Sequence, residues 1–244
     1  MELLVDTTFA PEEGRLSPDE SRHCVSVMRH RVGDNIYISN GTGVIWRCRL
    51  TEANARGCLV EIIEEQAEPS RSFSLIMAVA LTKNIDRFEW FVEKATEMRV
   101  ERIIPLVCEH SERVQVRLDR LQRVVIAAAK QSLKARLPIV EEPRKAIDLI
   151  RDNTYANTQR FIMHCDAPVS DNCTRKSHLL DLITPGNDLL LLIGPEGDFS
   201  QSEIEEAVVR QGFIEATLGD ERLRTETAAM TACHIGNLAN RTFG

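Results

Sequence analysis

The first 70 residues contain short runs in which hydrophobic and polar side chains alternate. Hydrophobic residues recur at every second position in residues 36–38, 46–50 and 58–62. This period is typical of strands that bury one face. Asn40-Gly41 lies between the first two runs, where a hairpin turn is expected, and residues 22–29 fit one short helix. We therefore expect residues 1–70 to form a small β-barrel.

After Phe73 the pattern changes to apolar runs that alternate with helical spacing. Strands are predicted near residues 75–81, 103–107, 161–165 and 189–193, and helices near 88–98, 118–132, 179, 200–211 and 226–240. Such alternation favours an α/β fold with a mostly parallel sheet covered on both faces. Pro69-Ser70-Arg71-Ser72 reads as a linker, which predicts one domain over residues 1–70 and another over 73–244.

Composition adds limits on location and on metal chemistry. The longest apolar run, residues 189–193, is too short to cross a bilayer, and no apolar run follows a basic start. Seven cysteines without a C-x-x-C pair, and six histidines without a cluster, indicate free thiols and no metal site. These features predict a cytoplasmic protein in a reducing compartment, with no membrane partner.

The formal net charge of −7 argues against a nucleic-acid partner, but the charge is unevenly distributed. From Arg113 to Arg136 there are seven basic residues and a single acid, Asp119. On the helix predicted here, Arg120, Arg123, Lys130 and Lys134 lie opposite the apolar side. Because acids are nearly absent, ion pairs along the helix cannot balance these charges. A surface that faces phosphates and a plain solvated face are about equally supported.

A strand-to-helix turn, Gly194-Pro195-Glu196-Gly197, follows the buried run 189–193. Ser200 and Glu203 have the spacing of a capping box, which places the start of the next helix. Glycines permit a close approach by a ligand, and loops at the carboxyl ends of parallel strands commonly bind one. The spacing matches neither G-x-G-x-x-G nor a Walker loop. A ligand site and a plain turn remain alternatives.

A second glycine turn lies in residues 218–228, where a short strand is again followed by a helix. Thr225 is a candidate N-cap, and Glu226 suits the positive end of that helix. Arg224 stands beside the exposed backbone N–H groups, where an anion is favoured, unless it pairs with an acid. Two such turns close together in the chain predict one shared pocket.

These two segments, IGPEGDFS at 193–200 and LGDERLRTETA at 218–228, resemble the RsmE family of ribosomal RNA methyltransferases, in the SPOUT superfamily. Residues 21–29, 32–34 and 40–41 resemble the family's PUA-like RNA-binding β-barrel, and residues 91–100, 104–106 and 127–132 its catalytic domain. The resemblance implies that the carboxyl-terminal segment threads through a loop, forming a trefoil knot that holds the cofactor, and that the protein is a homodimer. Three positions depart from the family's common residues: Asp198 and Arg99 replace Gly, and Lys130 replaces Glu.

The implied reaction is methyl transfer from S-adenosylmethionine to N3 of a uridine in the 16S rRNA of the small ribosomal subunit. No metal is implied. The resemblance assigns cofactor binding to Gly194, Pro195, Glu196, Gly197, Leu218, Gly219, Leu223 and Thr225. RNA contact is expected from Arg22 and Arg29 of the barrel and from Arg113, Arg120, Arg123, Lys130 and Lys134.

Methyl transfer to N3 requires removal of a proton and stabilisation of negative charge on the uracil oxygens. We expect Arg224 to supply the cation, and Glu196 or Glu226 to act as the base. Two other functions remain open. A non-catalytic RNA-binding module would leave the glycine turns unexplained, and a SPOUT enzyme could modify another target such as transfer RNA.

Overall fold

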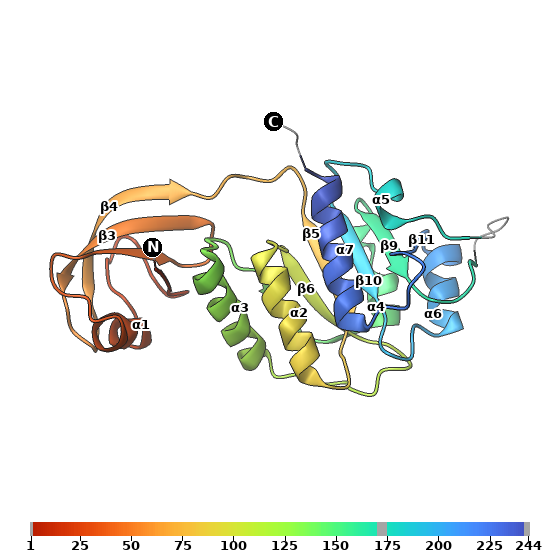
Figure 1. Cartoon of the computed structure of the whole chain (residues 1–244), viewed down its shortest axis with the longest axis horizontal. Coiled ribbons are helices and arrows are strands. Elements are labelled where there is room, and N and C mark those ends of the chain that lie inside the picture. Colours follow the sequence, from red (N-terminus) through yellow and green to blue (C-terminus); the bar gives the residue numbers. More distant parts are fainter. Residues whose placement is uncertain (1, 170–174, 242–244) are drawn as a thin grey trace. The chain divides into compact units, whose positions relative to one another are not determined.

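The protein is described by a computed structural model that covers residues 2–169 and 175–241. Its contacts separate two compact units. Unit 1 contains the residues up to Ser70 together with Val125–Leu137, and unit 2 contains Arg71–Val124 and the residues from Pro138 onward. The elements are drawn in Figure 1.

Unit 1 is built on a four-stranded sheet in the order β1-β2-β3-β4. Its elements are β1 (Leu3–Val5), α1 (Pro18–Arg22), β2 (Asn35–Ser39), β3 (Val44–Glu52) and β4 (Leu59–Ala67). The alternating runs correspond to β2, β3 and β4, which confirms those strands. Among the described residues no pair of these strands joins β4 back to β1, although an isolated antiparallel bridge pairs Arg15 with Leu59 of β4.

The helix of unit 1 lies earlier in the chain than predicted. It begins at Pro18, after Ser17, whose hydroxyl accepts a hydrogen bond from the Glu20 amide. A π-helical turn, His23–Val27, follows the helix. Arg29 then has φ 61°, a left-handed conformation that stops the helical course. The prediction of one regular helix over residues 22–29 is therefore wrong: the helix begins earlier, and the segment after it is a π-helical turn.

The second half of α3 (Leu118–Ser132) belongs to unit 1. Ala129 is buried in a cluster with Leu3 and Val5, and Ile126 packs against them. The segment after the helix is bonded to the turn between β2 and β3, because the Gly43 amide donates to the Ala135 carbonyl over 3.0 Å. Residues 125–137 thus complete the core of a unit that lies mainly at the other end of the chain.

Unit 2 contains a parallel sheet in the order β11-β9-β10-β5-β6-β7, with β8 also paired to β6. Its strands are β5 (Leu75–Ala80), β6 (Arg102–Val107), β7 (Ile139–Val140), β8 (Arg144–Lys145), β9 (Gln159–Met163), β10 (Leu189–Ile193) and β11 (Ile214–Ala216). Its helices are α2 (Ile85–Glu97), the first part of α3, α4 (Ala146–Ile150), α5 (Leu179–Leu182), α6 (Gln201–Glu205) and α7 (Thr225–Ala239). Every strand pair in this sheet is parallel, which confirms the predicted α/β architecture.

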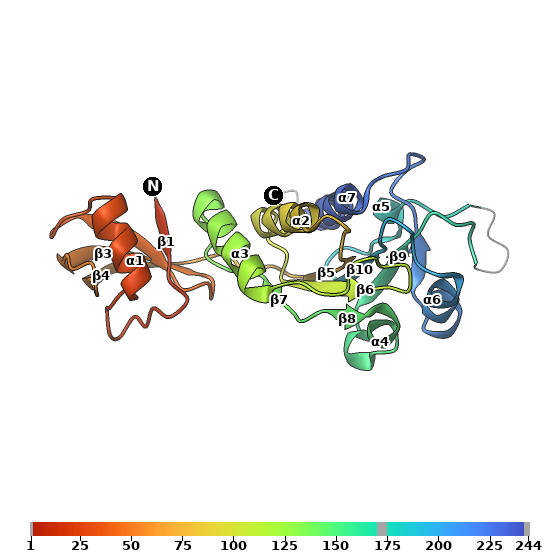
Figure 2. The ribbon, with the colours of Figure 1, turned by 90° about the horizontal axis from the view of Figure 1, so that it is seen from below.

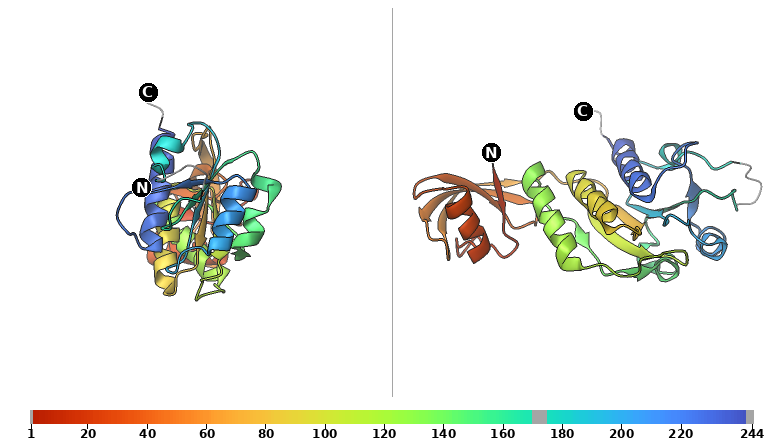
Figure 3. Two further views of the ribbon diagram at one scale, coloured as in Figure 1. Left: turned by 90° about the vertical axis from the view of Figure 1, so that its right-hand side faces the viewer. Right: turned by 60° about the horizontal axis from the view of Figure 1, so that its bottom comes forward.

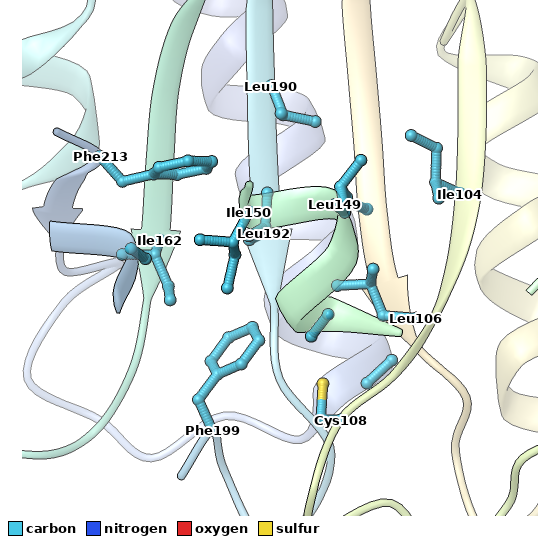
Figure 4. Packing of buried hydrophobic residues seen from close by; sticks show 14 of the residues in the cluster. Ile104, Leu106, Cys108, Leu149, Ile150, Ile162, Leu190, Leu192, Phe199 and Phe213 are labelled. Atoms are coloured by element: carbon cyan, nitrogen blue, oxygen red, sulfur yellow. The ribbon is translucent and has the colours of Figure 1, made fainter. Parts of the chain in front are cut away.

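Helices cover both faces of this sheet. Figure 2 shows α2 and α7 on one side and α4 and α6 on the other, and Figure 3 shows α2 beside α7. On the α4 and α6 side, Leu190 and Leu192 of β10 pack with Leu149 and Phe213 in one buried cluster (Figure 4). The predicted helix 200–211 is α6 followed by a π-helical turn that ends at Arg210. Within the described parts of the chain, no helix is both long and apolar enough for a membrane span.

Candidate active site

The first glycine turn follows β10 directly and is fixed by close packing. A Cβ on Gly194 would lie 3.0 Å from the Phe199 ring, so any other residue would push that ring aside. The predicted capping box is confirmed, because the Ser200 amide donates to Glu203 Oε2 over 2.9 Å and the Ser200 hydroxyl accepts from the Glu203 amide. The turn therefore has a fixed path from β10 into α6.

Hydrogen bonds tie this turn to the loops after three neighbouring strands. After β5, the Lys83 amide donates to Glu196 Oε1 over 3.1 Å. After β6, His110 Nδ1 donates to the Gly197 carbonyl over 3.0 Å. After β9, the Cys165 amide donates to Asp198 Oδ2 over 2.6 Å. The turn is thus held from both sides along the carboxyl edge of the sheet.

The second glycine turn is hydrogen-bonded to the first. β11 ends at Ala216, so the predicted strand lies two residues before Leu218. Gly219 has φ 134°, a conformation that favours glycine. Arg224 is the N-cap of α7 and Thr225 is its first residue, so the prediction of Thr225 as N-cap is wrong by one position. Instead, the Thr225 hydroxyl donates to the Gly194 carbonyl over 3.2 Å and joins the two turns.

Two cavities, of about 260 and 560 Å³, lie where these turns meet. They share walls, including Met163, Ile193 and Leu223. The smaller is lined by Gly194, Pro195, Glu196, Leu223 and Thr225, and the larger by Gly197, Leu218, Gly219 and Leu223. The structure thus brings all eight residues expected at the cofactor to one region.

Charged groups in this region are unevenly paired. Arg222 and Arg224 both line the smaller cavity and are exposed, and no acid among the described residues pairs with either of them. Glu196 lines the same cavity. Glu226 does not line it, and its carboxylate lies 3.7 Å from Arg87 Nε on α2. Positive charge without a protein partner therefore faces the smaller cavity.

A buried polar network lies beside the larger cavity. Lys176 Nζ is 3.2 Å from His164 Nδ1, and His164 Nε2 is 3.1 Å from Glu215 Oε2. An ammonium group can only donate, so Nδ1 accepts from Lys176 and Nε2–H donates to Glu215. Burial and the charge of Lys176 lower the pKa of His164, and burial also lowers the pKa of Lys176. Burial and Lys176 thus favour the neutral form of His164, whereas Glu215 acts in the opposite direction.

Several residues of the site carry no signal in the sequence patterns. His110, Cys165 and Lys176 lie in loops outside both glycine motifs, and their roles depend on contacts between distant segments. The sequence patterns single out Asp198 only as a departure from the family's common residues. In the structure Asp198 lines both cavities.

No group of three or more His, Cys, Asp or Glu side chains is placed to hold a metal within the described residues. The six cysteines that the structure describes are free, and of these Cys165 is exposed. Cys173 lies outside the described residues.

The basic side of α3 differs from the prediction in one respect. Arg120 Nη2 donates to Glu89 of α2 over 2.7 Å, and Arg123 pairs with Asp119 over 2.9 Å. Lys130 Nζ lies 2.6 Å from Glu20. Ion pairs along the helix involve Asp119 alone, and the charges of Arg120 and Lys130 are balanced by acids of other segments, which the helix pattern does not reveal.

Other predicted RNA-contact residues keep unbalanced charge. No ion pair is formed by Arg29, Arg113 or Lys134 within the described part of the chain, although Arg113 donates to the Lys83 carbonyl. Arg22 lies 3.6 Å from Asp19, and both side chains are largely exposed.

Comparison with known proteins decides the family. A family model described as an RNA methyltransferase domain matches residues 69–237, and one described as an RNA methyltransferase PUA domain matches residues 16–63. The chain belongs to the RsmE family of RNA methyltransferases. Curated relatives named ribosomal RNA small subunit methyltransferase E include one from Rickettsia conorii, 28% identical over 89% of this chain and 86% of its own length.

Solved structures agree with this assignment over the whole chain. A probable rRNA-methyltransferase from Porphyromonas gingivalis is 34% identical, covers 98% of each chain and has a TM-score of 0.88. The ribosomal RNA small subunit methyltransferase E from Neisseria gonorrhoeae is 26% identical, also covers 98% of each chain and has a TM-score of 0.83. These two structures thus share the fold of nearly the whole chain.

Proposed function

We propose that this RsmE-family chain transfers a methyl group from S-adenosylmethionine to N3 of a uridine in the 16S rRNA of the small ribosomal subunit. The observation that carries the proposal is the cavity between the two glycine turns, into which Arg224 faces without an acidic partner. The Neisseria gonorrhoeae relative is bound to S-adenosyl methionine, which supports this cofactor.

The residues of the cavity fit such a cofactor. Met163, Ile193 and Leu223 give an apolar wall for an adenine ring, and the glycine turns leave backbone groups open for polar contacts. A Cβ added to Gly219 would meet no atom within 4 Å, so the space beside this turn is open. When bound, the cofactor supplies an electrophilic methyl group on a positively charged sulfur.

The protein's own contribution is to align the uracil, stabilise its negative charge and accept its proton. Arg224 is assigned to the negative charge that develops on the uracil oxygens as N3 is deprotonated. Glu196 is favoured over Glu226 as the base, because Glu196 lines the cavity whereas Glu226 faces Arg87. Lys83 N–H occupies Glu196 Oε1, which leaves Oε2 to accept the proton.

RNA contact is assigned first to the basic residues whose charge is unbalanced, Arg29, Arg113 and Lys134. Arg22, Arg120, Arg123 and Lys130 would have to exchange an acidic partner for phosphate. The split into domains of residues 1–70 and 73–244 is proposed on the linker at residues 69–72, with residues 125–137 packed into the first unit. A location in the cytoplasm is proposed on the composition, and a homodimer on the resemblance to RsmE members.

A trefoil knot is proposed on the same ground, and the course of the chain after β11 supports it. From the edge strand β11 the chain passes Ser177, whose carbonyl accepts from the Thr217 amide. The Thr225 hydroxyl then donates to the Gly194 carbonyl. The helix α7, which begins at Thr225, packs on β5 and β10.

The test is transfer of label from S-adenosylmethionine to purified small subunits that lack the modification. We expect the wild-type chain to transfer label to the RNA of these small subunits and to no other purified RNA of the cell. Label in transfer RNA alone would favour a SPOUT enzyme with another target. Absence of cofactor binding would favour a non-catalytic RNA-binding module.

A further inference from the structure

Asp198 adopts a backbone conformation that ordinarily favours glycine. Its φ is 62°, in the left-handed region that few residues other than glycine enter, and aspartate is one of those few. The contacts of its carboxylate show what this residue adds to the turn.

Both carboxylate oxygens of Asp198 accept backbone N–H groups. Oδ1 accepts from the Phe199 amide over 2.8 Å, within its own turn, and Oδ2 accepts from the Cys165 amide over 2.6 Å. Asp198 follows β10 and Cys165 follows β9, and these strands are parallel neighbours. One side chain thus bridges the loops at the carboxyl ends of two adjacent strands, through charge-assisted bonds.

The two bridged loops form walls of both cavities, because Asp198 and Cys165 line each of them. On the other side the Asp198 turn is fixed by His110, whose Nδ1 lies 3.2 Å from the Asp198 carbonyl. The hydrogen bond from Cys165 to the Asp198 side chain therefore holds the start of the loop after β9 at a set distance from the fixed turn.

We propose that Asp198 is a positioning residue that sets the separation of these two loops and so preforms the pocket for the methyl donor. This inference rests on the proposed function and adds to it a residue that is not among those assigned to the cofactor. The bridge takes no part in proton transfer, so it governs cofactor affinity and leaves the chemical step unchanged.

The test compares the wild-type chain with Asp198→Gly and Asp198→Asn by calorimetric titration with S-adenosylmethionine and by steady-state kinetics. Loss of a charged hydrogen bond predicts a Kd and a cofactor KM raised about tenfold in Asp198→Gly, with kcat at saturating cofactor unchanged. Asp198→Asn keeps one acceptor oxygen and is expected to lie between the two. Leu133→Gly, which relieves a similar φ of 54° outside the pocket, is expected to leave the Kd unchanged.

Amide hydrogen exchange of Cys165, measured without cofactor, separates this inference from the proposed function. We expect faster exchange in Asp198→Gly than in the wild type, because the amide loses its acceptor. If the wild type binds no cofactor, the proposed function fails, and an unchanged exchange rate would still overturn the bridge. An unchanged Kd in Asp198→Gly overturns the proposal whatever the exchange rate.

Discussion

At the scale of single residues, Arg224 combines three properties that suit stabilisation of an anion. It is the N-cap of α7, it lines the smaller cavity and it has no acidic partner among the described residues. The helix end adds its own partial positive charge at the same place. The sequence placed Arg224 near a helix start, but its freedom from ion pairs is visible only in the structure.

Arg224→Ala is expected to lower kcat by about 10²–10³-fold while the Kd for S-adenosylmethionine stays the same. The physical reason is loss of a cation that acts on the uracil oxygens and makes no required contact with the cofactor. Single-turnover methylation of small subunits, with calorimetry for the Kd, measures both quantities. Arg224→Lys serves as the matched variant and is expected to recover part of the rate. Near-normal turnover in Arg224→Ala would remove this assignment.

Glu196→Gln tests the choice of base. Glutamine keeps an oxygen that can accept the Lys83 amide but cannot take the uracil proton, so we expect a slower chemical step with an intact turn. Glu226→Gln is the matched control and is expected to retain its rate, because Glu226 faces Arg87. The two rates are compared in single-turnover assays over a range of pH. The reverse order of the two rates would transfer the role to Glu226.

At the scale of elements, segments with a clear apolar or alternating pattern were predictable, and segments without one were not. The apolar run 189–193 is β10 residue for residue, and the capping box placed the start of α6. β1, β7, β8 and α4 have two to five residues each, too few for a period to show. The contacts that fix the glycine turn, from Lys83, His110 and Cys165, come from three separate loops and have no local signal.

The His164 network links β9, β11 and the segment that carries Lys176, and it makes stability depend on pH. Lys176, Glu215 and Asp198 are the charged groups that act on His164. Its pKa is lowered in the folded state, whereas the unfolded value is about 6.5. Below about pH 6.5 the unfolded state therefore binds more protons than the folded state, and the free energy of unfolding falls as the pH falls.

We accordingly expect the wild type to lose stability between about pH 6.5 and pH 5 more steeply than His164→Gln. The glutamine can neither charge nor titrate in this range. Urea unfolding at a series of pH values gives the two curves. Parallel curves for the two proteins would show that His164 does not contribute.

At the scale of the whole molecule, the class of fold was predictable, whereas the contribution of residues 125–137 to unit 1 was not. Alternating strands and helices implied the parallel sheet of unit 2, and three alternating runs implied the sheet of unit 1. The packing of residues 125–137 into unit 1 follows from contacts such as Ala129 with Leu3, which lie far apart in the sequence. For the same reason the acids that neutralise Arg120 and Lys130 could not be found from the helix alone.

RNA binding by the whole protein should depend mainly on the basic side chains that pair with no acid among the described residues. Lys134→Ala is expected to weaken binding to small-subunit RNA and to reduce the slope of log K against log salt by about 1. Arg120→Ala, whose charge is already balanced by Asp86 and Glu89, is the matched control and is expected to change the slope less. Filter binding across a salt series measures both. Equal effects would mean that pairing within the protein does not select the RNA-contact residues.

The central claim is that the cavity between the glycine turns directs a methyl group to N3 of a uridine in small-subunit RNA. The most direct measurement is mass spectrometry of nucleosides and mapped fragments from small subunits methylated by the purified wild-type chain. The account predicts one new N3-methyluridine at one position of 16S rRNA, strongly reduced with Arg224→Ala. A methyl group on another atom, or on several unrelated nucleotides, would contradict it.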